Sequence, residues 1–175
     1  MFAIAITLLV IDLKVPEVAE ADLADAVWDL GPSFFSYVLS FLVIGIYSMA
    51  HQRIFSVIVR GDGILTWLNM IYLMLIAFLP FPTAMRGDYD SSRFALIFYA
   101  AVHVVIGIVS LNIWLYATQG RRLTRPDLSE QVVSSGLVNG AVPTAIFLLS
   151  IGVAFIDVDL ATFTWIGLAI SGVIR

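Results

Sequence analysis

Long apolar segments are the feature that most constrains what this chain can fold into. Residues 33–50, 64–79, 94–118 and 131–155 are apolar over most of their length. A helix needs about 20 such residues to cross the ~30 Å hydrocarbon core of a bilayer. Hydrophobic residues make up 61% of the chain and charged residues 13%, against ~45–50% and ~25% in a soluble domain. The sequence therefore predicts an all-α membrane protein that crosses the bilayer repeatedly.

Two shorter apolar segments, residues 2–13 and 160–174, complete a predicted plan of six transmembrane helices in a single domain, residues 1–175. The first helix would be about 18 Å long at ~1.5 Å per residue, less than the bilayer core requires. We do not interpret it as a signal peptide, because a basic region before it and a small-residue cleavage site after it are both missing from the sequence.

Polar and helix-breaking residues predict where the spans end. We expect His51-Gln52-Arg53 to end the second span and Pro80-Phe81-Pro82 to end the third, because proline removes a backbone donor. Residues 86–93 then form a charged loop. Gly140 and Pro143 predict a kink in the fifth span. A short interfacial helix is expected around residues 24–30, within an acidic loop.

Basic residues divide unequally between the two sides of this plan. Six lie on the side of the termini (Arg53, Arg60, Arg121, Arg122, Arg125 and Arg175) and three on the other (Lys14, Arg86 and Arg93). This bias predicts that both termini are cytoplasmic. Of the 13 acids, all but Asp62, Asp127 and Glu130 face the opposite side. They would either raise the cation concentration at a pore mouth or only keep a loop soluble.

The first predicted helix carries a stripe on one face. Ile4, Thr7, Leu8 and Ile11 follow the i, i+3, i+4, i+7 spacing and share a sector of about 100°. A stripe of this kind is typical of core or lipid contact, so its periodicity alone does not predict a pore.

Polar groups within the other spans are few: Asn69, His103, Asn112 and Asn139. We expect the asparagines to join helices. His103, and His51 at the end of the second span, are either gating residues or ordinary hydrogen-bonding residues. The spans have no central charged residue, and no catalytic, metal-ligating or cofactor-binding pattern is visible. An enzyme is not expected, whereas a channel needs none of these groups, because a hydrophobic constriction can select ions.

Three stretches of sequence together indicate a family. FAIAITLLVIDLKVP in the first helix, SFLVIGIYSMAHQRIF in the second and NMIYLMLIAFLPFPTAMRG in the third resemble the transmembrane protein 175 family. These proteins are lysosomal potassium channels with shorter bacterial homologues. The second helix departs from the pattern, since the family has an aromatic residue where Ser48 stands and a histidine pair at His51-Gln52.

The resemblance implies a homotetramer of six-helix subunits with four first helices around a central pore for potassium ions. On this alignment Ile4, Leu8 and Ile11 form the apolar constriction, Thr7 contributes a ring of hydroxyl groups, and Asp12 is an acid at the pore mouth. The expected setting is the lipid bilayer of a bacterial inner membrane, with no cofactor and no nucleic-acid partner.

The family motif R-x-x-x-F-S-D-G-V precedes the segment FAIAIT, and Met1 stands where the valine is expected. We therefore expect the first helix to lack its cytoplasmic half in this sequence. Two other functions stay open at this point. One is a non-conducting membrane scaffold or degenerate paralogue, and the other is a weakly selective or proton-permeable pore.

Overall fold

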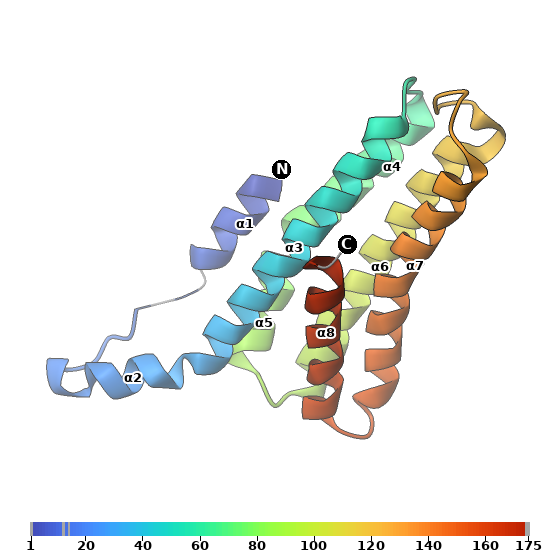
Figure 1. The fold of residues 1–175 in the computed structure, drawn as a ribbon. Helices are drawn as coiled ribbons and strands as arrows, with labels where there is room; N and C mark the ends of the chain where they lie inside the picture. Colours follow the sequence, from blue (N-terminus) through green and yellow to red (C-terminus); the bar gives the residue numbers. More distant parts are fainter. Residues whose placement is uncertain (1, 12, 14, 174–175) are drawn as a thin grey trace.

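The computed structural model describes residues 2–11, 13 and 15–173, and this part of the chain is helical, with no strand (Figure 1). The elements are α1 (Phe2–Ile11), η1 (Glu20–Asp22), α2 (Leu23–Asp29), α3 (Gly31–Val57), α4 (Gly63–Phe78), α5 (Pro80–Asp88), α6 (Arg93–Thr118), η2 (Gln119–Arg121), α7 (Glu130–Val153) and α8 (Val158–Val173). The short helix predicted at residues 24–30 is present as α2, which extends away from the long helices (Figure 1).

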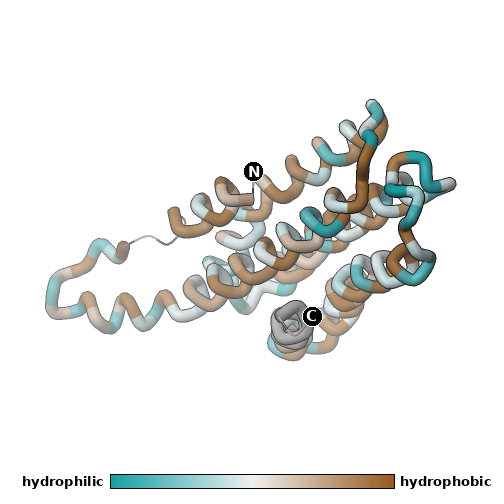
Figure 2. Tube along the Cα trace, turned by 45° about the horizontal axis from the view of Figure 1, so that its top comes forward, coloured by the Kyte–Doolittle hydropathy of each residue, from teal (hydrophilic) through white to brown (hydrophobic). Residues whose placement is uncertain are grey.

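Four helical segments are long and apolar enough to cross a membrane: Gly31–Val57, Gly63–Asp88, Arg93–Arg121 and Glu130–Val153. Helices α1 and α8 are shorter, at 10 and 16 residues. Figure 2 shows hydrophilic residues gathered in the loops at the ends of the bundle, and hydrophobic residues along the helices between them. The architecture is that of an all-helical, multi-pass membrane protein.

Of two predicted helix ends, the one at Pro80 is confirmed and the one at His51-Gln52-Arg53 is wrong. Helix α4 ends at Phe78, and Pro80 opens a further helix, α5, that continues to Asp88. Proline is tolerated in the first turn of a helix, where its missing N–H has no partner to lose. The second span continues through His51-Gln52-Arg53 to Val57, since one polar turn does not break backbone hydrogen bonding. Helix α7 also continues through Pro143, and the kink there stays a prediction.

Helix α6 forms the centre of the bundle and contacts α4, α5, α7 and α8. Its buried residues include Leu96, Tyr99 and His103. Ser40 Oγ of α3 lies 3.0 Å from the Tyr99 hydroxyl, and the Thr83 hydroxyl of α5 lies 2.9 Å from the same Ser40 atom. These hydrogen bonds join three helices inside the bundle, where water is not available to satisfy polar groups.

The loops are joined at one end of the bundle. Ile58, after α3, forms an isolated antiparallel bridge with Thr124, which follows η2. Asp62 caps α4 by accepting the backbone N–H of Leu65 at 2.9 Å, and it also accepts the Tyr116 hydroxyl at 2.6 Å. These two donors lower the pKa of the Asp62 carboxyl. The cap therefore stabilises the fold at neutral pH, and the contribution is lost as the pH falls through this lowered pKa.

The opposite end is joined by arginine side chains. Arg93 Nε donates to the Ala154 carbonyl oxygen at 2.9 Å, and the Arg86 guanidinium donates to Thr162 Oγ1 at 3.0 Å. Asp157 caps α8 by accepting the backbone N–H of Leu160 at 2.8 Å. The prediction that Arg86 begins a charged loop is wrong, because it belongs to α5, where it is 8% exposed.

Small residues let α6 and α7 approach closely. A Cβ atom added at Gly107 would meet the Thr144 side chain, and one added at Gly136 would meet the Trp114 ring. Trp114 is held in place because its indole N–H donates to the Val133 carbonyl oxygen at 3.0 Å. Glycine is required at these positions because two membrane helices in contact leave no space for a side chain between them.

This packing yields a stability prediction. Gly136→Ala should lower the free energy of unfolding by about 1–3 kcal/mol, because the added methyl group collides with the fixed Trp114 ring. The matched control is Gly45→Ala on α3, where nothing lies within 4 Å of the added atom. Thermal unfolding in detergent, followed by tryptophan fluorescence, compares the two. An equal effect of both substitutions would contradict the close α6–α7 packing.

Candidate ion pathway at the first helix

Helix α1 has two different faces. Ala5 is 0% exposed and Leu9 is 1% exposed, and both belong to the main hydrophobic core. On the other side, Ile4 is 58% exposed, Leu8 40% and Ile11 68%. The four residues of the predicted stripe therefore share a face that the rest of the subunit leaves uncovered.

Thr7 adds a hydroxyl group to this exposed face. Its Oγ1 donates to the Ile4 carbonyl oxygen at 2.9 Å. The hydrogen bond satisfies the donor within the helix and leaves the lone pairs of the oxygen as the remaining polar function. Chemically, the face is an apolar stripe with one oxygen acceptor near its middle.

Aromatic rings hold the start of α1 against α3 and α4. The Phe2 ring centroid lies 5.4 Å from that of His51 and 6.2 Å from that of Tyr72. His51 stacks on Phe55 at 4.4 Å, and its Nε2 lies 2.8 Å from Asn69 Oδ1. His51 therefore lies behind α1 and links two neighbouring helices. Any role in gating would act through the position of α1.

His103 lies deeper in the bundle and is 0% exposed. Its Nδ1 is 2.9 Å from the Tyr99 carbonyl oxygen, and its ring packs on Tyr99 at 4.2 Å and Phe147 at 4.4 Å. It shares no described contact with α1 or the stripe. The structure thus does not bring the two predicted histidines together.

Asp12, the predicted acid at the pore mouth, lies outside the described residues. The acids that follow it, Glu17, Glu20, Asp22, Asp25 and Asp29, are all exposed. Within the described part of the chain, no three histidine, cysteine or acidic residues come close enough to hold a metal ion. This segment therefore offers a diffuse negative potential.

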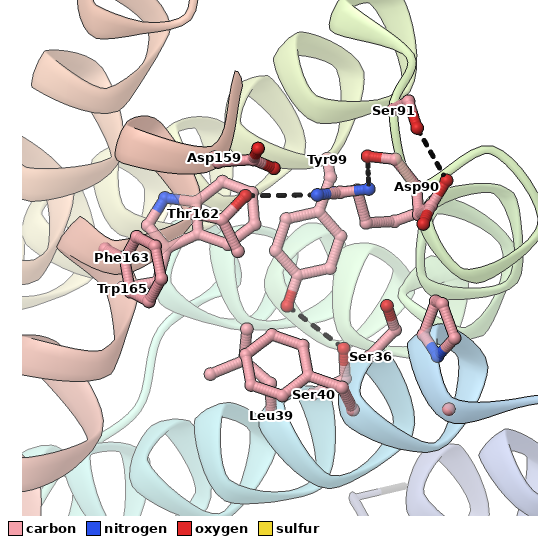
Figure 3. A pocket seen from close by; sticks show the side chains of 14 residues that line it. Ser36, Leu39, Ser40, Asp90, Ser91, Tyr99, Asp159, Thr162, Phe163 and Trp165 are labelled. Carbon is pink, nitrogen blue, oxygen red and sulfur yellow. Dashed lines mark hydrogen bonds between the residues drawn. The ribbon is translucent and has the colours of Figure 1, made fainter. Parts of the chain in front are cut away.

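The sequence did not reveal a second polar region, which contains Arg86. Arg86 lines a cavity between α3, α6 and α8, and Asp159 and Tyr99 are close enough to interact with its charge. Figure 3 shows Asp159 and Tyr99 in the wall of this cavity. This region was missed because the sequence predicted no helix after Pro80 and assigned Arg86 to a charged loop. An arginine at the end of an apolar stretch carries no signal of burial by itself.

Four helical segments of bilayer length, together with a short apolar helix that is exposed along one face, define a multi-pass helical membrane protein. Residues 1–80 match the family described as "Endosomal/lysosomal potassium channel TMEM175". The chain belongs to this family, whose members are ion channels and not enzymes.

This chain aligns with most of the length of two bacterial relatives. A potassium channel of Streptomyces collinus is 36% identical over 168 residues, which span 91% of this chain and 80% of that protein. A potassium channel of Chamaesiphon minutus is 33% identical over 181 residues, spanning 100% and 89%. A vertebrate relative, the endosomal/lysosomal proton channel TMEM175 of Danio rerio, is 34% identical over 80 residues, 46% of this chain and 15% of that protein.

The fold is also that of a solved relative. The crystal structure of a lysosomal potassium-selective channel TMEM175 homolog from Chamaesiphon minutus matches with a TM-score of 0.88 and 32% sequence identity. The match covers 99% of this chain and 91% of that one. The resemblance inferred from three short stretches is confirmed, and it extends over the whole helical arrangement.

The two faces of α1 provide a matched pair of adjacent leucines for testing this geometry. Leu9→Ala should lower the free energy of unfolding by about 2 kcal/mol or more, because it opens a cavity beneath a side chain that is 1% exposed. Leu8→Ala, at 40% exposed, should lower it much less. Thermal unfolding of the purified protein measures both. Equal losses would mean that α1 does not pack on its subunit through the Leu9 face.

Proposed function

We propose that the chain is one subunit of a potassium-permeable channel, and that four copies assemble with α1 of each copy at a central axis. The observation that carries the proposal is the exposed face of α1, on which Ile4, Thr7, Leu8 and Ile11 all lie. Both bacterial relatives are described as potassium channels, which supports potassium as the permeating ion.

Six crossing elements fit this proposal: α1, α3, α4 together with α5, α6, α7 and α8. The even number puts both termini on one side. The bridge between Ile58 and Thr124 brings the loops with Arg60 and Arg125 to the same end of the bundle, which supports a cytoplasmic end for them. A bacterial inner membrane is the matching location.

The mechanism follows from four-fold repetition of the α1 face. Rings of Ile4, Leu8 and Ile11 side chains around an axis would make a neck too apolar to hold bulk water. An ion crossing this neck must give up part of its hydration shell, and potassium surrenders water more readily than sodium does. Four Thr7 hydroxyl oxygens would replace some of the lost ligands, since their own donors are satisfied within the helix.

Potassium flux tests the constriction directly. Ile4→Asn should wet the neck and reduce the preference for potassium over sodium, measured as the shift in reversal potential of the reconstituted protein. Ile64→Asn on α4 is the matched control, because Ile64 is also 58% exposed but lies on another helix. A permeability ratio that both substitutions leave unchanged would place the neck elsewhere, and a lack of flux in the unaltered protein would favour a non-conducting scaffold.

Proton permeation is a second candidate function, since the Danio rerio relative is described as a proton channel. His51 is a titratable group beside the proposed pathway, because its ring lies 5.4 Å from that of Phe2 on α1, and its Nε2 is 2.8 Å from Asn69 Oδ1. Acidification of liposomes loaded with a pH-sensitive dye, compared between the unaltered protein and His51→Phe, separates proton from potassium conduction. Acidification that depends on His51 would support proton permeation.

The topology is tested by labelling introduced cysteines, which the absence of native cysteine makes simple. Asp127→Cys and Asp159→Cys replace exposed residues and should react with membrane-impermeant maleimide from opposite sides. Thr124 is less suitable because it is 3% exposed and forms the bridge with Ile58. Labelling of both cysteines from the same side would contradict the six-crossing arrangement.

A further inference from the structure

A cavity of about 490 Å³ opens at the end of the bundle opposite the Ile58–Thr124 bridge. Its wall is formed by the first turns of α3, the end of α5, the start of α6 and the start of α8. Figure 3 shows Ser36 and Ser40 of α3 on one side, Tyr99 behind, and Asp159, Thr162 and Trp165 of α8 on the other. The cavity is separate from the exposed face of α1.

A buried cation lines this cavity. Arg86 is 8% exposed, and its guanidinium donates to the backbone oxygen of Asp90 and, at 3.0 Å, to Thr162 Oγ1. Both acceptors are neutral, and Arg86 Nε is buried without a hydrogen-bond partner among the described residues. A buried guanidinium whose hydrogen-bond acceptors are all neutral oxygens keeps further N–H groups for a ligand with several acceptor atoms, although the carboxylates of Asp90 and Asp159 lie within electrostatic reach of its charge.

A second donor in the same wall has no acceptor. Trp165 is 1% exposed, and its indole Nε1 is buried without a partner in the part of the chain that the structure describes. Buried donors are almost always satisfied by protein, water or ligand. Both donor atoms are covered by protein, so a ligand in the cavity would meet the terminal N–H groups of the Arg86 guanidinium, and phosphate, with its several oxygen acceptors, is their common biological partner.

The mouth of the cavity carries the opposite charge. Asp90 and Asp159 line it, are exposed, and are close enough to Arg86 to interact with its charge. Two carboxylates there repel a simple anion but attract an ammonium group joined to one. Phe35 and Phe163 flank the mouth and are 45% and 66% exposed, so an apolar chain leaving the cavity would meet aromatic side chains and lipid.

We propose that this cavity binds a phosphoethanolamine group, presented by a membrane lipid. The phosphate accepts from the Arg86 guanidinium, the ammonium group lies beside Asp159, and the acyl chains pass Phe35 and Phe163. A soluble phosphoethanolamine has the same charged groups without the chains. The position of the cavity at the end of membrane-spanning helices, with exposed aromatic residues at its mouth, favours the lipid.

Native mass spectrometry of the delipidated protein tests the proposal. The protein is titrated with phosphatidylethanolamine and, separately, with phosphatidylglycerol, which has the phosphate but not the ammonium group. The unaltered protein should retain phosphatidylethanolamine at several-fold lower lipid concentration. Soluble O-phosphoethanolamine is then added as a competitor. Displacement of the lipid at equal concentration would show that the headgroup alone suffices, and much weaker displacement would show that the chains contribute.

Two variants test which charged side chain contacts the phosphate and which contacts the ammonium group. Arg86→Gln should weaken retention of both lipids about tenfold or more, because it removes the charge-assisted hydrogen bonds to phosphate. Arg93→Gln is the matched control, since Arg93 lies at the same end but donates to the Ala154 carbonyl oxygen and lies over the Phe155 ring, outside the cavity. Asp159→Asn should weaken only phosphatidylethanolamine, by at least about threefold, and so reduce the preference between the lipids.

Equal retention of the two lipids by the unaltered protein, or an equal effect of Arg86→Gln and Arg93→Gln, would overturn the proposal. Arg86→Gln could instead prevent folding, because the residue is buried. The decision then rests on Asp159→Asn, which changes an exposed side chain that does not cap α8. An unchanged lipid preference in that variant would also overturn the proposal. None of these readouts depends on ion flux.

Discussion

The structure depends on one constraint: polar groups within the hydrocarbon core must find partners inside the protein. For the backbone, the constraint is met by helices, and even the junction at Leu79 keeps a hydrogen bond from its N–H to the Ile76 carbonyl oxygen. For side chains, it produces the cluster of Ser40, Thr83 and Tyr99, which joins α3, α5 and α6. The remaining helices pack around this hydrogen-bonded centre.

The same constraint explains why the subunit alone looks incomplete at α1. Apolar side chains gain little by packing on one another in lipid, so helices associate through shape and polar contacts. Helix α1 has such contacts on one side, where Phe2 meets His51 and Tyr72 and where Ala5 and Leu9 are buried. Its other side is regular, apolar and uncovered, and symmetric assembly would bring four such faces together. The proposed pathway is thus a property of the assembly.

The Arg86 cavity shows how the bundle stabilises a charged side chain that would be unfavourable in contact with lipid. Arg86 is drawn between α5 and α8 by hydrogen bonds to Asp90 and Thr162, so the guanidinium helps to hold α8 in place. Its neighbours are not enough to satisfy it, because Nε has no partner in the described structure. A lipid phosphate bound there would accept from the terminal N–H groups of Arg86 and would link the stability of the channel to the surrounding membrane.

The sequence by itself determined the class, the family and the periodicity of α1, because bilayer thickness and helical repeat act on local runs of residues. It placed Ile4, Thr7, Leu8 and Ile11 on one face. Tertiary structure decided which face of α1 is covered, since burial of Leu9 depends on residues distant in sequence. It also decided that Pro80 begins a helix and that Arg86 lies in a cavity. The fate of a proline or an arginine at the end of a span is set by the helices packed against it, and local sequence does not encode those neighbours.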